Sequence, residues 1–411
     1  MKIHMLKYFL VSIAIVGVAT VAIAAETIKI AVIDAIDNPS EDQNLKSWRA
    51  ITDRANAKGG VLAGIKFEVV PFDSGNDVQQ SLAMLNQAID QHIAYVASTN
   101  SRVVLALADA IAKHNSAHPD RRALLLNFGA KAPALTEDQC NFWHFRFSPH
   151  TNMDMNFLTN HIAGQKDIHK VYLVNQDYAY GQSVRKAAKE MLAQKRPDLK
   201  IVGDDLVPLL KTKDFSPIVN KIRDSGADTV ITGNWGDDLN LLLKASGPDL
   251  NVRYYTTIND VPGTAAAISA SKAKSVIGVF DWYANVESNP YADYNPEFRA
   301  KYNAVGNFDF IKAIRVVEML AQAINKAKSA EPLKVAHALE GMRYNGASGE
   351  AWMRAEDHQL IAPIYLASFE KTGQRGVKFD EENTGYGWKT EAKIEAKEVV
   401  PPINCKMERP R

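Results

Sequence analysis

Two consecutive series of short apolar segments, each followed by a helix-like segment, constrain the fold of this chain more than any other feature. Near-continuous apolar strands are typical of a sheet that is buried on both faces, and their alternation with helices is typical of parallel β-α-β units. The sequence therefore predicts an α/β fold with two lobes, each built on a doubly wound parallel sheet. The predicted strands are residues 27–33, 65–71, 94–97 and 123–127 in the first series, and residues 171–175, 200–206, 228–232, 252–257 and 276–280 in the second.

The first 25 residues have the composition of a secretory signal peptide. Lys2 and Lys7 precede an apolar run over residues 8–18, and residues 22–25 are mostly small. This order of charged, apolar and small residues predicts a cleaved signal and an exported chain. An uncleaved membrane anchor is the alternative, although the apolar run is short for a membrane span.

Length and charge limit what the exported chain can be. About 385 residues are more than one hydrophobic core usually holds, so two domains are expected. Loss of Lys2 and Lys7 leaves 46 of the 48 basic residues against 47 acidic ones. A near-neutral chain without a basic tract is not expected to bind nucleic acid.

The sequence contains two cysteines, Cys140 and Cys405, which lie far apart along the chain. In an oxidising compartment an even pair predicts one disulfide, which would tie the end of the chain to a segment near its middle. Two unpaired thiols are the alternative. Neither cysteine has a partner at the spacing of a zinc site.

The sequence lacks the short motifs that accompany the commoner catalytic chemistries. It contains no G-x-S-x-G, H-E-x-x-H, C-x-x-C, Walker A or G-x-G-x-x-G pattern. The histidines between residues 144 and 169 have spacings that fit no metal motif. We therefore predict that the protein is not an enzyme and that it uses neither a metal nor a cofactor.

Three segments resemble one family of exported proteins. They are residues 56–64 (NAKGGVLAG), residues 178–182 (YAYGQ) and residues 213–215 (KDF) ahead of a helix. As a set they resemble the leucine/isoleucine/valine-binding protein family, the periplasmic solute-binding components of ABC transporters. The likeness runs from about residue 27 to residue 369. It implies two lobes joined by three hinge crossings, with an amino acid held between them.

The resemblance and the strand series together suggest domain boundaries. We place the crossings near residues 145–149, 280–284 and 345–350. The expected first lobe comprises residues 26–146 and 283–345, the second comprises residues 147–282 and 346–398, and residues 399–411 form a C-terminal tail. Two helices, at residues 297–304 and 308–328, should pack on the first lobe.

In the first lobe, the resemblance implies contacts to the ligand carboxylate. Ser101 matches the family's serine after the third strand, and Gly129 and Ala130 fall where backbone groups meet the ligand after the fourth. The alternatives are structural, since serine also caps helices and glycine also forms plain turns. Lys131 stands where relatives carry a small hydroxyl residue; a contact to the ligand carboxylate is the alternative, but we expect its side chain to point into solvent.

In the second lobe, Tyr180 matches a ligand-contacting tyrosine of the family, and aromatic faces at clefts anchor ligands. Trp235 ends a predicted strand and fits a wall that stacks against the ligand. The family's acidic partner for the ligand ammonium would fall at Asn259, with Asp260 adjacent. Because a buried cation without an anion is unfavourable, either Asp260 supplies the charge or the ligand is not a standard α-amino acid.

The sequence thus predicts a periplasmic binding protein that captures an amino acid or related small solute and delivers it to the permease subunits of an ABC transporter. We expect it to act as a monomer. The alternatives are an exported ligand sensor with the same fold, and a binder of an amide, urea or carboxylate solute. An enzyme would convert the bound compound, whereas a binding protein releases it unchanged.

Overall fold

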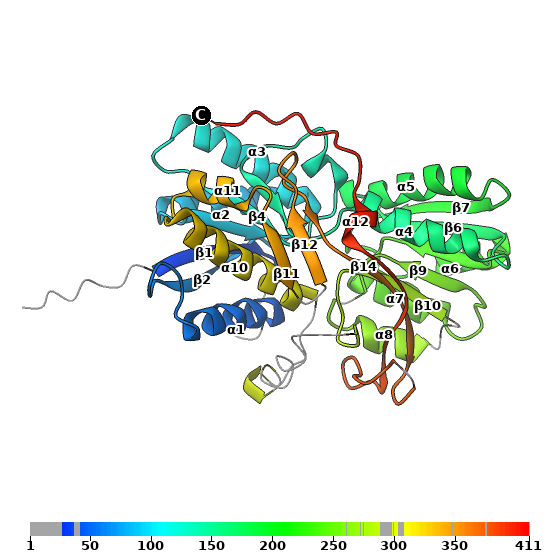
Figure 1. Cartoon of the computed structure of the whole chain (residues 1–411). Coiled ribbons are helices and arrows are strands. Elements are labelled where there is room, and N and C mark those ends of the chain that lie inside the picture. Colours follow the sequence, from blue (N-terminus) through cyan, green and yellow to red (C-terminus); the bar gives the residue numbers. More distant parts are fainter. Residues whose placement is uncertain are drawn as a thin grey trace, which may run out of the picture.

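The computed structural model describes residues 27–36, 42–259, 261–271, 273, 275–287, 298, 300–302, 308–346, 349–374 and 376–410. Two large sheets lie in the two halves of the molecule, which we call the first and second lobes (Figure 1). The predicted fold class, two α/β lobes, is confirmed. The predicted signal peptide, residues 1–25, lies outside the described residues. Within the described ranges, no helix combines the length and hydropathy that a membrane crossing needs.

The sheet of the first lobe is parallel throughout and has the strand order β2-β1-β3-β4-β5. Its strands are β1 (Thr27–Asp34), β2 (Lys66–Asp73), β3 (Tyr95–Ser98), β4 (Leu124–Asn127) and β5 (His144–Arg146). The first four are the predicted strands. The sequence does not reveal β5, because three residues are too few to show a pattern.

Helices cover both faces of this sheet. They are α1 (Gln43–Ala57), α2 (Val78–Asp90), α3 (Ser101–Ala117), α10 (Phe308–Ala327) and α11 (Pro332–Leu339), with a 3-10 turn, η1 (Pro133–Thr136), after β4. Helix α1 packs against α10, and α2 packs against α3. The starts of α2 and α3 are fixed by side chains, since Asp77 accepts from the Gln80 N–H at 2.9 Å and Asn100 accepts from the Arg102 N–H at 3.0 Å.

The sheet of the second lobe has the order β15-β14-β10-β9-β8-β6-β7. Its strands are β6 (Lys170–Gln176), β7 (Lys200–Val207), β8 (Thr229–Thr232), β9 (Arg253–Thr256), β10 (Ser275–Phe280), β14 (Ile364–Lys371) and β15 (Tyr386–Ile394). The strands from β7 to β10 are parallel, whereas β14 and β15 add an antiparallel edge. The associated helices are α4 (Thr151–Gly164), α5 (Ala179–Lys195), α6 (Ser216–Ser225), α7 (Asp237–Ser246) and α8 (Thr264–Ser271).

A third, smaller sheet shows that the last of the three crossings between the lobes, which we call passages, occurs further along the chain than the sequence predicted. It consists of β11 (Arg343–Gly346), β12 (Gly349–Met353) and β13 (Leu360–Ile361), all antiparallel. It lies beside the first sheet, because Gln359 forms a bridge with Arg146 of β5 and the Tyr344 hydroxyl donates to Glu318 of α10 at 2.7 Å. The chain therefore passes to the second lobe between β13 and β14, not at residues 345–350, where β11 and β12 pair with each other.

The first passage joins β5 to α4. The second lies beyond residues 280–284, since the Asn285 amide still donates to the Phe379 carbonyl of the second lobe at 2.8 Å. Lys301, by contrast, pairs with Asp53 of α1 at 2.7 Å and so belongs to the first lobe. Of the helix expected at residues 297–304, the structure describes residues 298 and 300–302, which are helical, and the other residues lie outside the described ranges.

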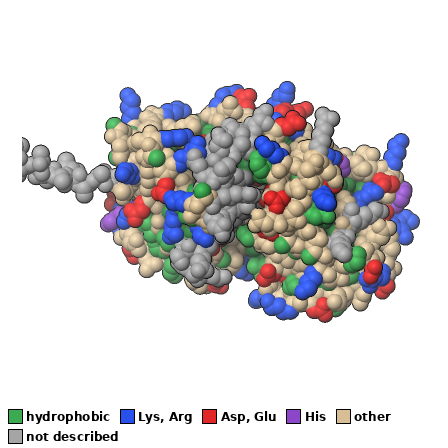
Figure 2. All heavy atoms as spheres, turned by 90° about the horizontal axis from the view of Figure 1, so that it is seen from below, with side chains coloured by type: hydrophobic (Ala, Val, Ile, Leu, Met, Phe, Trp, Pro, Cys, Tyr) green, Lys and Arg blue, Asp and Glu red, His purple; other side chains and the backbone are tan. Residues whose placement is uncertain are grey.

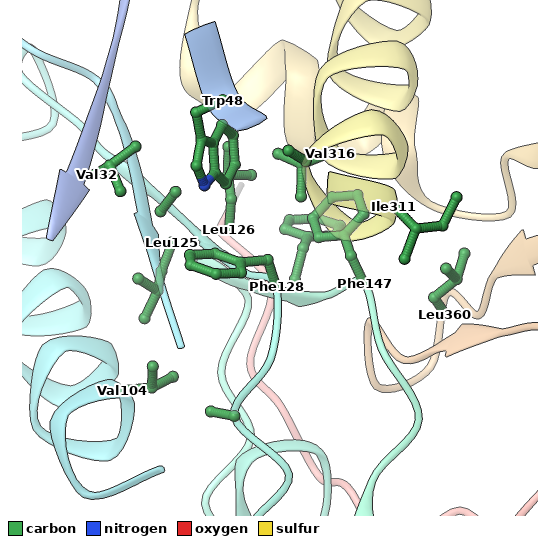
Figure 3. Packing of buried hydrophobic residues seen from close by; sticks show 14 of the residues in the cluster. Val32, Trp48, Val104, Leu125, Leu126, Phe128, Phe147, Ile311, Val316 and Leu360 are labelled. Atoms are coloured by element: carbon green, nitrogen blue, oxygen red, sulfur yellow. The ribbon is translucent and has the colours of Figure 1, made fainter. Parts of the chain in front are cut away.

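The core of the first lobe fixes the turn that follows β4. Trp48 of α1 meets Phe128 edge to face, with ring centroids 5.2 Å apart, and Phe147 lies on the side of α10 (Figure 3). All three rings are fully buried. Burial of each contributes about 1.5–3 kcal/mol or more. Since Phe128 directly precedes Gly129, this packing holds the backbone of the turn in place.

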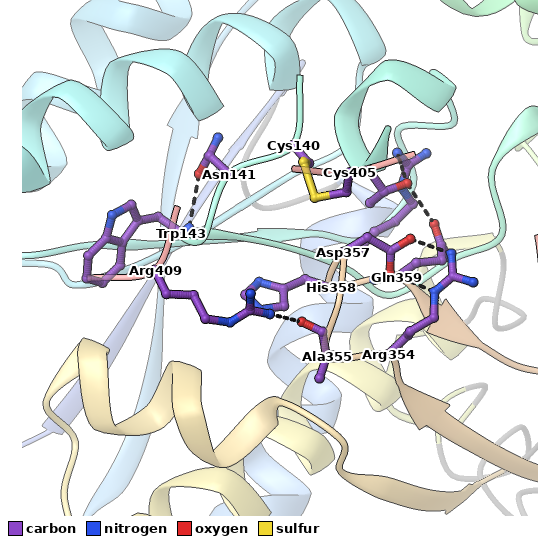
Figure 4. The surroundings of a disulfide bond; sticks show 12 residues. Cys140, Asn141, Trp143, Arg354, Ala355, Asp357, His358, Gln359, Cys405 and Arg409 are labelled. Carbon is purple, nitrogen blue, oxygen red and sulfur yellow. Dashed lines mark hydrogen bonds and ion pairs between the residues drawn. A yellow bond between two sulfur atoms is a disulfide. The ribbon is translucent and has the colours of Figure 1, made fainter. Parts of the chain in front are cut away.

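The C-terminal tail returns from the second lobe to the first. Ala396 and Val399 of α12 (Ala396–Val399) are buried in a core of the second lobe, and the chain then runs across to the first lobe (Figure 1). Cys405 is bonded there to Cys140, with Cα atoms 5.7 Å apart (Figure 4). The tail therefore adds a covalent link between the lobes beside the three passages. The sequence analysis did not predict strand β15 or helix α12.

Replacing both cysteines, Cys140→Ser with Cys405→Ser, should lower the free energy of unfolding by about 2–5 kcal/mol, because the bond constrains a long stretch of the unfolded chain. Guanidinium unfolding followed by tryptophan fluorescence measures the change. The matched control is the wild type in reductant, which should lose similar stability. Free thiols in the unreduced wild type, found by intact mass, would contradict the bridge.

Candidate functional site

A cavity of about 200 Å³ lies between the lobes, at the carboxyl ends of the strands of both sheets. In open α/β sheets, ligands bind at this edge because the strand interiors are buried on both faces. The residues that line the cavity follow strand ends or begin helices. Those of the first lobe are Asp34, Ala35, Asn44, Asn76, Thr99, Asn100, Ser101, Gly129 and Lys131, and those of the second are Tyr178, Tyr180, Trp235, Ile258 and Val261.

Ser101 joins the start of α3 to the turn after β4. Its Oγ accepts hydrogen bonds from the N–H groups of Lys131 at 3.1 Å and Ala132 at 3.2 Å. The hydroxyl hydrogen of Ser101 can therefore donate to an acceptor in the cavity. Because the N-terminus of a long helix favours negative charge, this wall suits a carboxylate or carbonyl oxygen of a ligand.

Gly129 lines the cavity, whereas Ala130 does not. The N–H groups of both residues donate to Oδ1 of Asn127, at 3.2 Å for Gly129 and 2.8 Å for Ala130. Asparagine commonly closes a turn on its own backbone in this way. The two N–H groups proposed to bind the ligand carboxylate are thus already bonded within the protein.

Three aromatic side chains form the wall of the second lobe. Tyr178 and Tyr180 flank the start of α5 and meet edge to face at 5.9 Å, and the indole N–H of Trp235 donates to the Tyr178 hydroxyl at 2.8 Å. The Tyr180 hydroxyl shares a hydrogen bond of 2.5 Å with Thr257. Because these polar tips are bonded within the lobe, the rings meet the cavity largely through their carbon surfaces. Such surfaces pack on apolar groups and attract cations.

Hydrogen bonds between strand ends hold the aromatic wall in place. Gln176, at the end of β6, donates to the Trp235 carbonyl at 3.2 Å and to Asp238 at 2.8 Å. Asn175 accepts from the Gly233 N–H at 2.7 Å. Gly181 lets α5 approach β6 closely, since a Cβ at this position would lie 2.0 Å from the Gln176 carbonyl oxygen.

Asn259 does not line the cavity. Its side chain is buried within the second lobe, where it bonds the Thr256 hydroxyl and lies against Gly278, at which an added Cβ would meet the Asn259 amide at 2.3 Å. Asp260, the other residue suggested for the ligand ammonium, lies outside the described residues.

Lys131 does not point into solvent, and that expectation is wrong. It is 4% exposed, and its Nζ lies 2.6 Å from Oδ2 of Asp154 on α4 and 3.4 Å from the Thr257 carbonyl oxygen. Both partners belong to the second lobe, so a buried ion pair joins the lobes beside the cavity. Burial outweighs the attraction of Lys131 and raises the pKa of Asp154 above its ordinary value.

A family described as periplasmic binding protein matches residues 27–374. The chain belongs to the periplasmic binding protein family. It is 28% identical over 403 residues to the Leu/Ile/Val-binding protein homolog 4 of Brucella melitensis, with 94% of each chain covered. It is 23% identical over 350 residues to the leucine-, isoleucine-, valine-, threonine-, and alanine-binding protein of Pseudomonas aeruginosa, covering 82% of this chain and 88% of that one. The closed structure of the protein with that name from Brucella ovis superimposes with a TM-score of 0.80 at 26% identity, covering 94% of this chain and 100% of that one.

Members of this family bind solutes rather than act as enzymes, and the resemblance to the leucine/isoleucine/valine-binding family is confirmed. In the described part of this periplasmic binding protein, no cluster of three histidine, cysteine or carboxylate side chains is arranged to hold a metal ion.

Asp34 is the carboxylate found among the described lining residues, and sequence reasoning did not select it. It ends β1 and is 8% exposed, and its Oδ1 accepts from the Ala35 N–H at 2.8 Å. Burial raises the pKa of Asp34 to about 7; hydrogen bonds from the Ala35 N–H and the Asn44 side chain oppose this shift, and the neighbouring Asp42 and Asp73 add to it.

Unliganded Asp34→Asn protein should show the consequence of this raised pKa. An unfolded aspartate has a pKa of about 3.9, so between about pH 4 and pH 7 the folded wild type binds more protons than the unfolded chain and loses stability as the pH rises. The variant has no carboxyl group at this position, so it does not lose stability in this way as the pH rises. Its free energy of unfolding relative to wild type should therefore increase over this range, by up to roughly 4 kcal/mol.

Urea unfolding of both proteins from pH 4 to pH 8 measures this difference. The matched control is Asp109→Asn, at an exposed position on α3, where loss of a surface charge pair changes stability by less than about 1 kcal/mol. A difference between Asp34→Asn and wild type that does not change with pH would contradict the assignment.

Lys131→Met should lower the free energy of unfolding by about 3–5 kcal/mol, because it leaves the Asp154 carboxylate buried without its partner. The double variant Lys131→Met with Asp154→Leu should regain at least half of the loss, since it removes both charges. Denaturant unfolding measures both. The exposed pair of Lys113 and Asp109 provides the control, and losses that simply add in the double variant would contradict a direct interaction.

Proposed function

We propose that this protein is the periplasmic solute-binding component of an ABC transporter, which captures an amino acid or related small solute between its lobes and delivers it unchanged to the membrane permease. The observation that carries the proposal is the cavity of about 200 Å³ with walls from both lobes. A cavity of this size suits a small solute. The signal-like first 25 residues support export to the periplasm.

Closure of the lobes explains how such a protein binds and releases its solute. Ser101 and Gly129 come from the first lobe and Tyr180 and Trp235 from the second, so only a closed arrangement brings all four to one ligand. A ligand that contacts both walls stabilises the closed form by its additional contacts there. Rotation about the three passages then exposes the solute again.

The outer surface is consistent with a partner that is not nucleic acid. On the face drawn in Figure 2, basic and acidic side chains are interspersed over both lobes. With a formal net charge of +1 for the whole chain, long-range attraction for a polyanion is weak. We expect the permease to dock on the lobes of a single protein molecule, since the cavity is complete within one chain.

Tyr180→Ala and Trp235→Ala should each abolish the rise in thermal midpoint that a bound solute gives the wild type, because a ligand stabilises only the state that binds it. The solute is found by a thermal-shift screen of branched-chain, aromatic and polar amino acids, amides, urea and small carboxylic acids. The protein is first unfolded and refolded to remove any solute that accompanies it.

The matched control is Tyr386→Ala, which removes an aromatic ring from β15 at a position that is 37% exposed. It should keep the full thermal shift. An undiminished shift in Tyr180→Ala and Trp235→Ala would place the ligand elsewhere, and recovery of an altered compound after unfolding would indicate turnover instead of binding.

A further inference from the structure

The charges along the cavity do not balance. Apart from the tyrosines, the ionisable residues among the described lining residues are Asp34 and Lys131. Asp154 compensates the charge of Lys131 at 2.6 Å. Asp34 forms no ion pair with any residue that the structure describes. When Asp34 is ionised, these described side chains leave one negative charge uncompensated at the cavity.

One oxygen of Asp34 is held in the protein and the other is not. The Ala35 N–H donates to Oδ1, and the side chain of Asn44, which also lines the cavity, hydrogen-bonds to the carboxylate, whereas Oδ2 is buried and has no hydrogen-bond partner among the described residues. The two neighbouring carboxylates are hydrogen-bonded within the protein. Asp42 caps α1 by accepting from the Leu45 N–H at 2.9 Å, and Asp73 accepts from the Ile36 N–H at 3.0 Å. Asp34 is 8% exposed, and a buried acceptor without a donor, on the wall of a cavity, is unfavourable unless something that enters the cavity donates to it.

The other walls of the cavity indicate which further chemical groups a ligand with such a donor carries. The start of α3 and the Ser101 hydroxyl suit an anionic or carbonyl oxygen. Strands β1 and β3 are neighbours in the sheet, so Asp34 and Ser101 stand at adjacent strand ends, about 5 Å apart between strand axes. The carbon faces of Tyr178, Tyr180 and Trp235 lie on the other lobe and tolerate both a cation and an apolar group.

We propose that Asp34 binds a protonated amine of the solute, so that the first lobe recognises the cationic nitrogen at the end of β1. This inference rests on the proposed function. It makes the ligand a small amine-bearing solute, and it assigns the charge recognition to a residue other than Asn259, which is turned away from the cavity. Recognition by Asp260 in the second lobe is the competing outcome.

Refolded wild-type protein is titrated by calorimetry at pH 8 with pairs of compounds that differ only in an amine or a hydroxyl group. The pairs are L-leucine with 2-hydroxy-4-methylpentanoate, L-phenylalanine with 3-phenyllactate, 4-aminobutanoate with 4-hydroxybutanoate, and putrescine with 1,4-butanediol. The compound extracted from freshly purified protein is identified by mass spectrometry and included. The best binder should carry an amine, and its hydroxyl counterpart should bind at least about 100-fold more weakly.

Variants then test which residue is responsible for the preference for an amine over its hydroxyl counterpart. Asp34→Asn should lose about 100-fold in affinity for the amine and most of its preference over the hydroxyl counterpart. Asp260→Asn should stay within about threefold of wild type if Asp34 alone recognises the amine, and so should the exposed control Asp109→Asn, whose surface charge contributes little. A best binder without a basic nitrogen would overturn the inference, as would full affinity in Asp34→Asn or transfer of the loss to Asp260→Asn.

A measurement without ligand separates recognition from a structural role. At pH 8, unliganded Asp34→Asn should have a higher thermal midpoint than wild type, because the variant keeps the acceptor for Ala35 and loses the uncompensated charge. A lower midpoint would show that the carboxylate holds the turn after β1, and would overturn the inference. If the refolded wild type binds neither these compounds nor any solute of the thermal-shift screen, the proposed function fails, whereas binding of an uncharged solute refutes only the role of Asp34.

Discussion

Parallel strands that are buried on both faces leave one edge of each sheet at which polar side chains can meet a ligand. In both lobes this edge is at the carboxyl ends of the strands, where the chain turns into the next helix. Asp34, Ser101 and Gly129 follow or end strands of the first sheet, and Tyr180 and Trp235 follow strands of the second. Because the two edges face each other, the cavity is a product of both lobes. Neither sheet alone provides a complete site.

Buried charges mark the junction of the lobes. Arg315 of α10 pairs with Asp281 at 2.5 Å and also donates to the carbonyl oxygens of Asp281 and Phe147. Burial disfavours the charge of Asp281, but Arg315, Lys312 and Lys131 outweigh it and hold its pKa below the ordinary value. Buried ion pairs contribute little net stability compared with apolar packing, although breaking one is costly. Their contribution here is geometric, since Arg315 holds Asp281, which directly follows β10, against Phe147 at the start of the first passage.

The sequence predicted most of the strands of both sheets, because long apolar runs between turn residues have few other interpretations. It missed β5, which is too short to show a pattern, and β15, whose exposed and charged residues resemble a loop. It also placed the third passage at residues 345–350, since a small antiparallel hairpin and a hinge crossing look alike as polar, glycine-containing segments. The pairing between β11 and β12, which no local sequence pattern reveals, shows that this segment is a hairpin and not a hinge crossing.

For the site, Ser101, Gly129, Tyr180 and Trp235 could be named from strand ends and from the resemblance, and all four line the cavity. Asp34 has the same signal, a polar residue that ends an apolar strand, but sequence reasoning did not select it. Side-chain direction and one backbone hydrogen bond decided the remaining cases. The Asn259 side chain turns into its own lobe, the Ala130 N–H donates to the Asn127 side chain, and the Lys131 side chain turns towards Asp154.

The amino-acid order by itself determined the two α/β lobes, the export signal as an expectation, and the strand ends at which a ligand could be met, because these depend on the local pattern of apolar and polar residues. Only the tertiary structure decided which polar groups remain for a ligand. That outcome depends on partners distant in sequence, such as Asp154 for Lys131 and Ser101 for the turn after β4. A buried polar group that finds such a partner becomes part of the framework, whereas one that finds none, as at Oδ2 of Asp34 among the described residues, stays available to the solute.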